Sequence, residues 1–309
     1  MVERRGTARI CEGRIVIVTG AGRGLGREHA LAFARAGAKV VVNDLGAEID
    51  GSGSSDGPAG EVVDLIRSEG GEAVVNGADV ADWAQAAAMV QQAVDTFGGL
   101  DVIVNNAGFL RDRMLANCSE AEWDAVVRVH MKGHFAPSRH AIEWWKGRSK
   151  AGEEVAGRII NTSSGAGLMG SVGQGNYSAA KAGIAALTLV ESAEFGRYGV
   201  TANAIAPAAR TRMTEQVFAA TMAEPGEGEF DAMDPANVSP LVVWLGSLES
   251  AAVTGRVFEV EGGKVSVADG WQHGPEIDKG ARWSPDELGP VVEGLLAEAP
   301  APAPVYGAR

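Results

Sequence analysis

Tyr177 and Lys181 lie four positions apart, which on a helix places both side chains on one face, one turn from each other. A tyrosine ordinarily has a pKa of about 10, so it is a poor base near neutral pH. An ammonium about 5 Å away, at an effective dielectric of about 20, favours the phenolate by roughly 3 kcal/mol, which lowers the pKa by about 2. The pair therefore predicts a tyrosine that takes up and releases a proton, with Lys181 lowering its pKa.

Ser164 adds a hydroxyl that precedes Tyr177 by thirteen residues (164 to 177) and follows an apolar run ending at Thr162. A hydroxyl in this place could donate a hydrogen bond to a substrate oxygen on which negative charge develops. The three side chains together predict proton transfer to or from a substrate oxygen, with Tyr177 as the acid in one direction and the base in the other.

A glycine-rich turn near the N-terminus predicts a dinucleotide site. Residues 19–26 follow the spacing Gly-xxx-Gly-x-Gly, and the members that we assign to the site are Gly20, Arg23, Gly24, Leu25 and Gly26. Glycines let the backbone approach a pyrophosphate, and the N-terminus of the next helix offers free N–H groups and a partial positive charge. Alone, such a run can be only a tight turn, but its place between a strand and a helix favours the phosphate site.

Asp44 ends the second apolar run, twenty positions after Gly24 (24 to 44). A carboxylate there can accept hydrogen bonds from both ribose hydroxyls of NAD and repels the 2′-phosphate of NADP. Arg23 argues the other way, because a cation in the glycine turn could pair with that phosphate. Leu45 adds no positive charge beside the carboxylate, so we expect NAD as the cofactor.

The elements that must carry these residues alternate along the chain. Apolar, β-branched runs predict strands at residues 14–19, 39–43, 72–76, 100–105, 158–162, 200–205 and 256–260. Helical patterns run from the glycine turn to about residue 36 and over 61–68, 83–97, 120–145 and 176–197, with a loop at 46–60. Strands with continuous apolar runs are covered on both faces, so we expect an α/β fold: a Rossmann-type, doubly wound, seven-stranded parallel sheet with helices on both faces.

With these motifs in order, the sequence closely resembles the short-chain dehydrogenase/reductase family over about residues 10–265. The resemblance implies an NAD-dependent oxidoreductase that interconverts a secondary alcohol and a ketone by direct hydride transfer. It implies that Ser164, Tyr177 and Lys181 are catalytic and that Lys181 also binds the nicotinamide ribose. Further family motifs imply cofactor contacts at Asp79, Val80, Asn106, Ala107, Gly108, Pro207 and Thr211.

Two positions depart from the family pattern. His130 stands where the family often has an asparagine that holds a water of the proton relay, and a histidine could also hold that water or simply be packed in the helix. The usual Pro-Gly is Pro207-Ala208, whose backbone has less freedom. Both departures resemble one branch, the (3R)-hydroxyacyl-CoA dehydrogenase unit of multifunctional β-oxidation enzymes, to which bacterial steroid and terpenoid alcohol dehydrogenases are similar.

This branch implies a small-molecule substrate that is bulky and mostly apolar, such as a 3-hydroxyacyl-CoA or a steroid- or terpenoid-type alcohol. Arginines near the expected cleft mouth could meet CoA phosphates: Arg111, Arg113, Arg210 and Arg212. The alternative is a dinucleotide-binding sensor without turnover, which the intact Ser164, Tyr177 and Lys181 do not favour. The sequence does not identify the substrate or the physiological direction.

Composition excludes other classes of protein. A net charge of −13 argues against nucleic acid or an anionic membrane as the main partner. The two cysteines fit neither a disulfide framework nor a zinc site, and His130 and His134 lack a third ligand, so we expect no metal. Because there is no spanning apolar run and no signal-peptide core, we expect a cytoplasmic protein.

We divide the chain into residues 1–263, which hold the cofactor and catalytic sites, and a C-terminal extension at 264–309. In the extension, residues 264–267 could lengthen the seventh strand or pair with it, Ser284 and Glu287 predict a helix start, and a flexible tail follows. We expect residues 264–300 to enclose the substrate, over their own cleft or on a neighbouring subunit; a stabilising surface flap is the alternative.

Apolar positions in the Tyr177 helix predict a homotetramer, with a dimer as the next choice.

Overall fold

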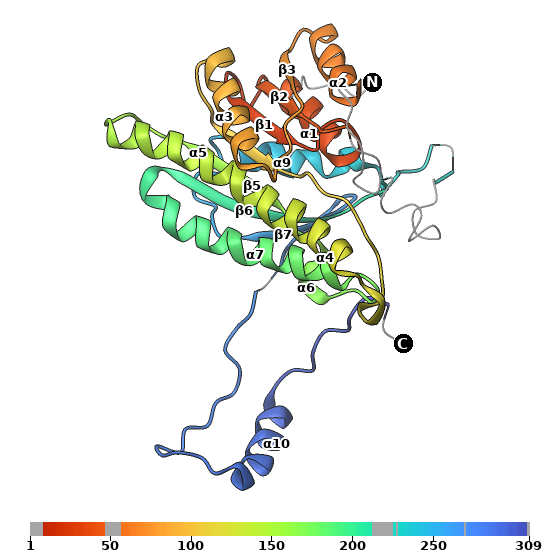
Figure 1. The fold of residues 1–309 in the computed structure, drawn as a ribbon, viewed down its shortest axis with the longest axis vertical. Helices are drawn as coiled ribbons and strands as arrows, with labels where there is room; N and C mark the ends of the chain where they lie inside the picture. Colours follow the sequence, from red (N-terminus) through yellow and green to blue (C-terminus); the bar gives the residue numbers. More distant parts are fainter. Residues whose placement is uncertain (1–8, 47–56, 212–224, 227, 269, 308–309) are drawn as a thin grey trace.

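One mixed sheet organises the protein (Figure 1). The computed structural model describes residues 9–46, 57–211, 225–226, 228–268 and 270–307. The strand order is β3-β2-β1-β4-β5-β6-β7-β8; the first seven strands are parallel, and β8 pairs with β7 in the antiparallel sense. The strands are β1 (Ile15–Thr19), β2 (Lys39–Asn43), β3 (Glu72–Asn76), β4 (Val102–Asn105), β5 (Gly157–Thr162), β6 (Val200–Ala208), β7 (Val257–Glu261) and β8 (Lys264–Ala268). The predicted α/β fold is confirmed, and the segment after β7 pairs with that strand.

Helices follow most strands and cover both faces of the sheet. They are α1 (Gly24–Arg35), α2 (Gly57–Ser68), α3 (Trp83–Phe97), α4 (Glu120–Val127), α5 (Gly133–Lys150), α6 (Gly165–Met169), α7 (Gly175–Phe195), α9 (Ser239–Gly246) and α10 (Leu288–Glu298). Short 3₁₀ turns lie at η1 (Leu115–Asn117), η3 (Gly196–Tyr198), η4 (Pro235–Asn237) and η5 (Pro285–Glu287), and one π-helical turn, η2 (Arg128–Lys132), joins α4 to α5.

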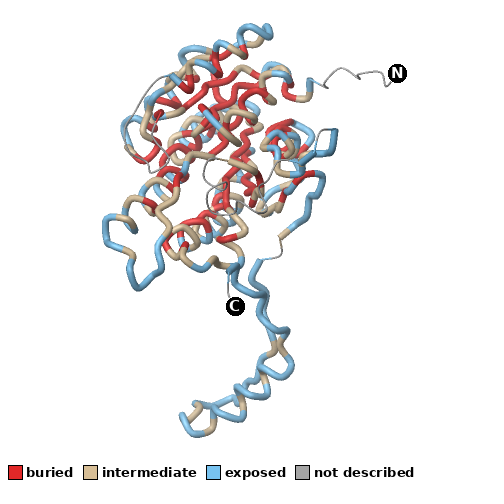
Figure 2. The backbone as a smooth tube through the Cα atoms, turned by 90° about the vertical axis from the view of Figure 1, so that its right-hand side faces the viewer, coloured by how far each residue is buried: buried red, intermediate tan, exposed pale blue. Residues whose placement is uncertain are grey.

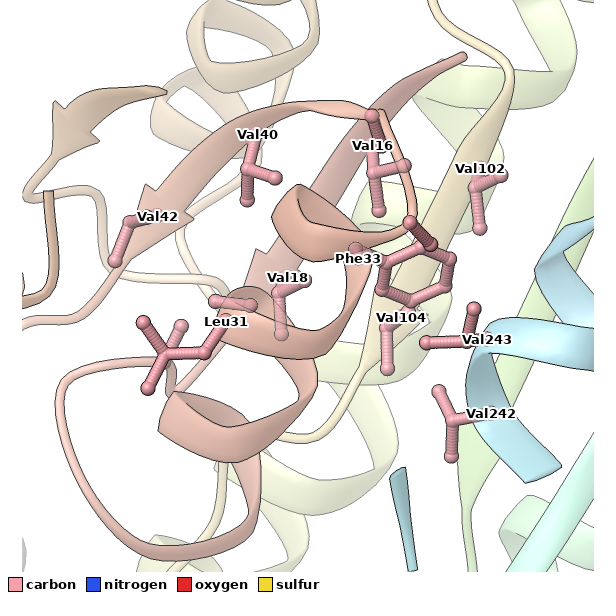
Figure 3. Close-up of a cluster of buried hydrophobic side chains, with 14 of the residues drawn as sticks. Val16, Val18, Leu31, Phe33, Val40, Val42, Val102, Val104, Val242 and Val243 are labelled. Atoms are coloured by element: carbon pink, nitrogen blue, oxygen red, sulfur yellow. The ribbon is translucent and has the colours of Figure 1, made fainter. Parts of the chain in front are cut away.

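Alternate side chains of the central strands enter two separate cores. In β1, Val16 and Val18 pack with side chains of α1, α2 and α9 (Figure 3). Phe33 of α1 is fully buried in this core. Ile15 and Ile17 point to the opposite face and pack with α3 and α5, around Trp145. This two-residue period explains why the strands read as continuous apolar runs: each strand is covered on both sides.

The strand order reverses between β1 and β4, the place where doubly wound sheets bind ligands. Register brings the carboxyl ends of neighbouring strands level: Val18 pairs with Val104 and with Val42, and Asn105 pairs with Asn161. The residues that follow these strands, which include most of the predicted site, therefore lie at one edge of the sheet.

Three predicted elements need correction. Helix α2 begins at Gly57 and not at residue 61, since Pro58 near its start has the backbone angle that a first helical turn requires. The predicted helix at 120–145 contains the π-helical turn η2 and continues to Lys150. Strand β6 continues through Ala208, which pairs with Glu261, so alanine in place of the usual glycine is accommodated as extended backbone.

The C-terminal extension leaves the body and returns to it. Ser284 and Glu287 form the predicted capping box, and α10 follows. The helix stands apart from the sheet and its helices (Figure 1), none of its residues is buried, and the arm that carries it is largely exposed (Figure 2). The helix therefore does not cover the cleft of its own chain, which corrects that part of the expectation; the tail after it docks back on the body at Tyr306.

Candidate active site

Ser164, Tyr177 and Lys181 come together at the ends of β5 and α7. Ser164 follows β5 and caps the N-terminus of α6, and its side chain hydrogen-bonds to Tyr177. The Nζ atom of Lys181 lies 5.5 Å from the centre of the Tyr177 ring and donates a hydrogen bond of 2.6 Å to the carbonyl of Thr162. The structure thus brings together the three residues that the sequence singled out.

Burial controls the protonation of this group. It raises the pKa of Tyr177 to about 12, with the Ser164 hydrogen bond opposing the rise and the charge of Asp112 adding to it. It also lowers the pKa of Lys181 to about 7. The sequence predicted a lowered tyrosine pKa, but it could not show how far both groups are removed from water. In the free protein, Tyr177 therefore holds its proton and is ready to act as an acid.

His130 lies beside Tyr177, with the two rings edge to face and their centres 5.2 Å apart. Its Nε2 atom is 2.8 Å from the carbonyl oxygen of Phe109 and 3.3 Å from the Phe109 amide nitrogen, so the tautomer decides which of them it binds. Its Nδ1 atom is buried with no hydrogen-bond partner among the described residues. Burial lowers the pKa of His130 to about 3, and the Lys181 charge lowers it further, so the ring is neutral at working pH.

His130 lies in the π-helical turn η2 and His134 in the first turn of α5, and both side chains are buried. π-Helical turns are rare and frequently occur at functional sites. His134, which the sequence analysis did not assign to the site, is almost fully buried beside Lys181 and faces the carbonyls of His130 and Thr162. Neither of its ring nitrogens makes a hydrogen bond of good geometry within the part of the chain that the structure describes. Burial and the Lys181 charge lower its pKa.

The glycine turn between β1 and α1 has the predicted shape. Gly20 and Gly24 have positive φ angles, and a Cβ atom on Gly26 would lie 2.1 Å from the carbonyl oxygen of Gly20. Only glycine therefore allows this close approach of backbone to backbone. Arg23 and Leu25 flank these positions, and the Arg23 side chain is exposed at the start of α1.

Asp44 faces this turn from the end of β2. One carboxylate oxygen accepts a hydrogen bond of 2.7 Å from the Gly22 amide, and the other accepts one of 2.7 Å from the Gly46 amide. Each oxygen keeps a second lone pair, so the carboxylate can still accept from ribose hydroxyls. The fixed negative charge stands beside the glycine turn, where the sequence placed it.

The other predicted cofactor residues lie at the same edge of the sheet. Thr19 Oγ1 accepts hydrogen bonds from the amides of Asn106 and Ala107, at 2.9 Å and 3.1 Å. Thr211 lies next to Gly24, its Cγ2 atom 3.6 Å from the position of a Cβ there. Pro207 pairs in register with Val260 near the end of β6.

Asp79 and Val80 follow β3. The Asp79 carboxylate pairs with Arg128 at 2.5 Å and accepts a hydrogen bond of 2.9 Å from the Ala81 amide. Val80 is buried against Gly133, where a Cβ atom would meet it at 2.7 Å. This corner is thereby fixed to the turn that carries His130.

A loop that the sequence reading had not linked to the catalytic residues holds the start of α7. The side chain of Asn176 donates to the carbonyl of Arg111 at 3.0 Å, and Gln174 donates to a carboxylate oxygen of Asp112 at 3.0 Å. The Arg113 amide donates to the Gly173 carbonyl at 2.8 Å. The sequence signal was present in the amide side chains just before Tyr177, but their partners are some sixty residues away (|i−j| of 62 and 65).

A buried polar cluster lies below the catalytic group, and sequence reasoning missed it. Asn161 donates to the carboxylate of Glu191 at 2.7 Å and to the hydroxyl of Thr188 at 2.9 Å. Asn105 donates to Asn161 and to Ser138, each at 2.9 Å. Burial raises the pKa of Glu191 to about 7, with hydrogen bonds from Asn161 and Ser138 opposing the rise.

The arginines proposed for CoA contacts have protein partners. Arg113 pairs with Glu122 at 3.0 Å, and Arg210 pairs with Asp231. The Arg111 guanidinium lies 5.9 Å from the centre of the Phe109 ring. Arg212 lies outside the described residues.

Comparison with known proteins identifies the family. The profile of the family described as short chain dehydrogenase matches residues 14–221. A crystal structure of a short chain dehydrogenase from Mycobacterium avium is 68% identical, superposes with a TM-score of 0.88, and matches 97% of this chain and 100% of that one. The chain therefore belongs to the short-chain dehydrogenase family, and it is an oxidoreductase that works with a nicotinamide dinucleotide.

Relatives with known names show which branch of the family the chain resembles. The hydroxyacyl-CoA dehydrogenase ChsB1 of Mycobacterium tuberculosis is 45% identical over 283 residues, which are 89% of this chain and 86% of ChsB1. The peroxisomal multifunctional enzyme type 2 of Mus musculus is 44% identical over 252 residues, which are 82% of this chain but 32% of that enzyme. The predicted resemblance to hydroxyacyl-CoA dehydrogenase units is confirmed.

The described residues show neither a metal-binding cluster nor a membrane-spanning helix. They contain no group of three or more His, Cys, Asp or Glu side chains arranged to hold a metal ion. Among the same residues, no helix has the length and apolar character needed to cross a bilayer.

Proposed function

We propose that this protein is an NAD-dependent dehydrogenase that interconverts a secondary alcohol and its ketone on an acyl-CoA thioester. The observation that carries the chemistry is the contact of Ser164 with Tyr177, with Lys181 one turn away. The names of ChsB1 and of the multifunctional enzyme support the substrate class. A steroid- or terpenoid-type alcohol is the second candidate, because bulky apolar substrates fit the branch of the family that the sequence resembles.

Tyr177 transfers the proton in this proposal. In reduction, its phenol donates a proton to the ketone oxygen as the hydride arrives at the carbon; in oxidation, the phenolate takes the alcohol proton back. Ser164 donates a hydrogen bond to the same oxygen and stabilises the charge that develops on it. Lys181 faces the Tyr177 ring and favours the phenolate. NAD(H) bound here supplies the hydride or accepts it, and its oxidised form adds a positive charge.

The glycine turn and Asp44 fit the NAD form of the cofactor. A Cβ atom on Gly20, Gly22 or Gly26 would lie within 2.8 Å of neighbouring atoms. Glycine at these positions keeps the turn compact, so a pyrophosphate can approach the backbone at the start of α1. Asp44 faces the turn with lone pairs available for ribose hydroxyls and a charge that repels a 2′-phosphate. Arg23, the residue that could favour NADP, is exposed at the rim of the turn. We assign Asp79, Val80, Asn106, Ala107, Gly108, Pro207 and Thr211 to the same cofactor site.

We also propose that the protein is a homotetramer or a dimer. Leu189 and Val190 of α7 are each 51% exposed in the single chain, which supports a homotetramer or a dimer through this helix; light scattering at micromolar concentration tests it. A cytoplasmic location and the division at residue 263 rest on the sequence alone. A sensor without turnover is not favoured, because the catalytic side chains are in contact.

The direct test is a spectrophotometric screen at 340 nm, the absorbance wavelength of NADH. Purified protein is mixed with NAD and hydroxyacyl-CoA thioesters, hydroxysteroids or terpenoid alcohols in turn. We expect NADH formation with at least one hydroxyacyl-CoA. Turnover with free steroids or terpenoids alone would replace the substrate class, and no turnover with any of them in either direction would contradict the proposed function.

A further inference from the structure

The C-terminal tail returns to the segment that joins the catalytic serine and tyrosine. The Tyr306 amide donates to the Gly170 carbonyl at 3.2 Å, and the Val172 amide donates to the Tyr306 carbonyl at 2.9 Å. Tyr306 thereby forms a parallel β-bridge with Ser171. These contacts hold the tail against residues 170–172. In the sequence, this segment lies between Ser164 and Tyr177.

The ring of Tyr306 lies against the residue next to the catalytic serine. Its hydroxyl oxygen and its Cε2 atom are each 3.1 Å from the position that a Cβ on Gly165 would take. Val305 packs on Gly170 in the same way, at 3.4 Å. The tail therefore contacts α6 at its first residue, directly after Ser164.

Exposed apolar side chains surround this contact. We call them the apolar rim; they are Met114, Leu115, Met169, Val172, Val305 and Tyr306, each at least 36% exposed. Leu115 of the rim packs on Gly175 at the start of α7, and Val172 lies against Gly307 of the tail. A recess of about 350 Å³ lies beside the rim and is lined by Asp112, Arg113, Met114, Asn117 and Gly173.

The apolar rim lies next to the place where the substrate must react. The reacting oxygen of the substrate must lie at Ser164 and Tyr177, and the segment between these two residues carries Met169 and Val172 of the rim. A short acyl group ends near the reacting carbon, whereas a longer one must extend past this segment. Apolar surface that is left exposed beside a catalytic pair gains free energy when an apolar chain covers it.

We propose that Val305 and Tyr306 form a wall of the substrate site, and that the apolar rim binds the bulky acyl group of the thioester. The proposal rests on the proposed function and deepens it by naming a specificity element. It also revises the role of the extension: α10 stands away from the cleft of its own chain, while the tail beyond it reaches that cleft.

The test compares Tyr306→Ala and Tyr306→Phe with Leu296→Ala in the full chain. Leu296 is the matched control, because it lies on the same extension but is 68% exposed on α10. We measure kcat and KM with 3-hydroxybutyryl-CoA and 3-hydroxydecanoyl-CoA, and the Kd of NADH. Tyr306→Ala should raise KM for the longer thioester about tenfold, which corresponds to roughly 1.4 kcal/mol, and leave the shorter thioester and NADH unchanged. Tyr306→Phe should keep most of the affinity, and Leu296→Ala all of it.

A binding measurement separates this proposal from the proposed function. Calorimetry with decanoyl-CoA in the presence of NADH needs no turnover, so it tests the wall even if the protein does not oxidise hydroxyacyl-CoA. A higher Kd of decanoyl-CoA in Tyr306→Ala than in the wild type supports the proposal that Tyr306 forms a wall of the substrate site. An equal Kd in the wild type and Tyr306→Ala, or an equal change in KM for both thioesters, would overturn it. A changed oligomeric state with unchanged Kd would also overturn it and would assign the rim to contacts between copies of the chain.

Discussion

Gly108 packs so closely against the His130 ring that no side chain fits at position 108. A Cβ atom on Gly108 would lie 2.2 Å from Cε1 and 2.9 Å from Nδ1 of His130. His130 in turn lies edge to face with Tyr177 and contacts the backbone of Phe109. The glycine after β4 therefore allows the imidazole to stand between the cofactor edge of the sheet and the catalytic tyrosine.

Gly108→Ala should consequently displace His130 and slow turnover. We expect kcat to fall at least about tenfold, since the added methyl group must push the buried ring or the backbone aside. Gly147→Ala in α5 is the matched control, because nothing lies within 4 Å of the position of its Cβ. Steady-state kinetics check the prediction, and melting curves check folding. Unchanged kcat in Gly108→Ala would show that the position of His130 does not matter to catalysis.

His130 should act through a hydrogen bond and not by storing a proton. Burial lowers its pKa to about 3, so the ring stays neutral between about pH 5 and 8. If Nδ1 orients a relay water, His130→Ala should slow turnover about tenfold or more, and His130→Asn should largely restore it. The pH dependence of kcat should lack a step due to this residue. Equal losses in both variants would instead assign His130 a packing role.

Sequence patterns predicted the strands and helices best where local chemistry decides them. Strands β2 and β3 and helix α3 have the predicted bounds, since β-branched runs and an Ala-rich amphipathic stretch fix them locally. The π-helical turn was not predictable, because its His130 contacts Phe109 and Tyr177, which lie far from it in the sequence. The docking of Tyr306 on Ser171 was likewise hidden, because it joins segments 135 residues apart (171 to 306).

The catalytic residues were predictable from their spacing, but their pKa values were not. Tyr177 and Lys181 lie on one helical face, as the four-residue spacing requires. The extent of burial depends on α4, η2 and α5, which pack against α7 from distant parts of the chain. Burial raises the pKa of Tyr177 and outweighs the opposing hydrogen bond of Ser164, so the direction of the tyrosine shift could not be predicted from the sequence.

Glu191 should make folding stability depend on pH. Its folded pKa is raised from 4.5 to about 7, so between these values the folded state binds more protons than the unfolded state. The contribution of Glu191 is therefore present below pH 4.5 and is lost as the pH rises to about 7. Glu191→Gln lacks this loss, and its stability relative to the wild type should rise by about 3 kcal/mol between those limits. Urea unfolding of both proteins at several pH values measures the difference; a pH-independent difference would contradict a raised pKa.

Asp44 should determine the cofactor preference. The wild type should bind NADH at least about tenfold more tightly than NADPH, because the carboxylate repels the 2′-phosphate. Asp44→Ala should weaken NADH binding and reduce the preference, and Arg23→Ala should leave it in place. Fluorescence titration of both nucleotides with each protein provides the constants. Tighter binding of NADPH by the wild type would show that Arg23 outweighs Asp44.

Tyr177 is the group that transfers the proton in both directions of the proposed reaction, and Tyr177→Phe tests this role most directly because it removes only the hydroxyl. We predict a loss of at least about 100-fold in kcat with a hydroxyacyl-CoA and NAD, while the Kd of NADH stays within about twofold of the wild-type value. Ser164→Ala should also lower kcat, and Lys181→Met should lower both kcat and the affinity for NAD. Turnover by Tyr177→Phe at a rate near that of the wild type would contradict the central claim.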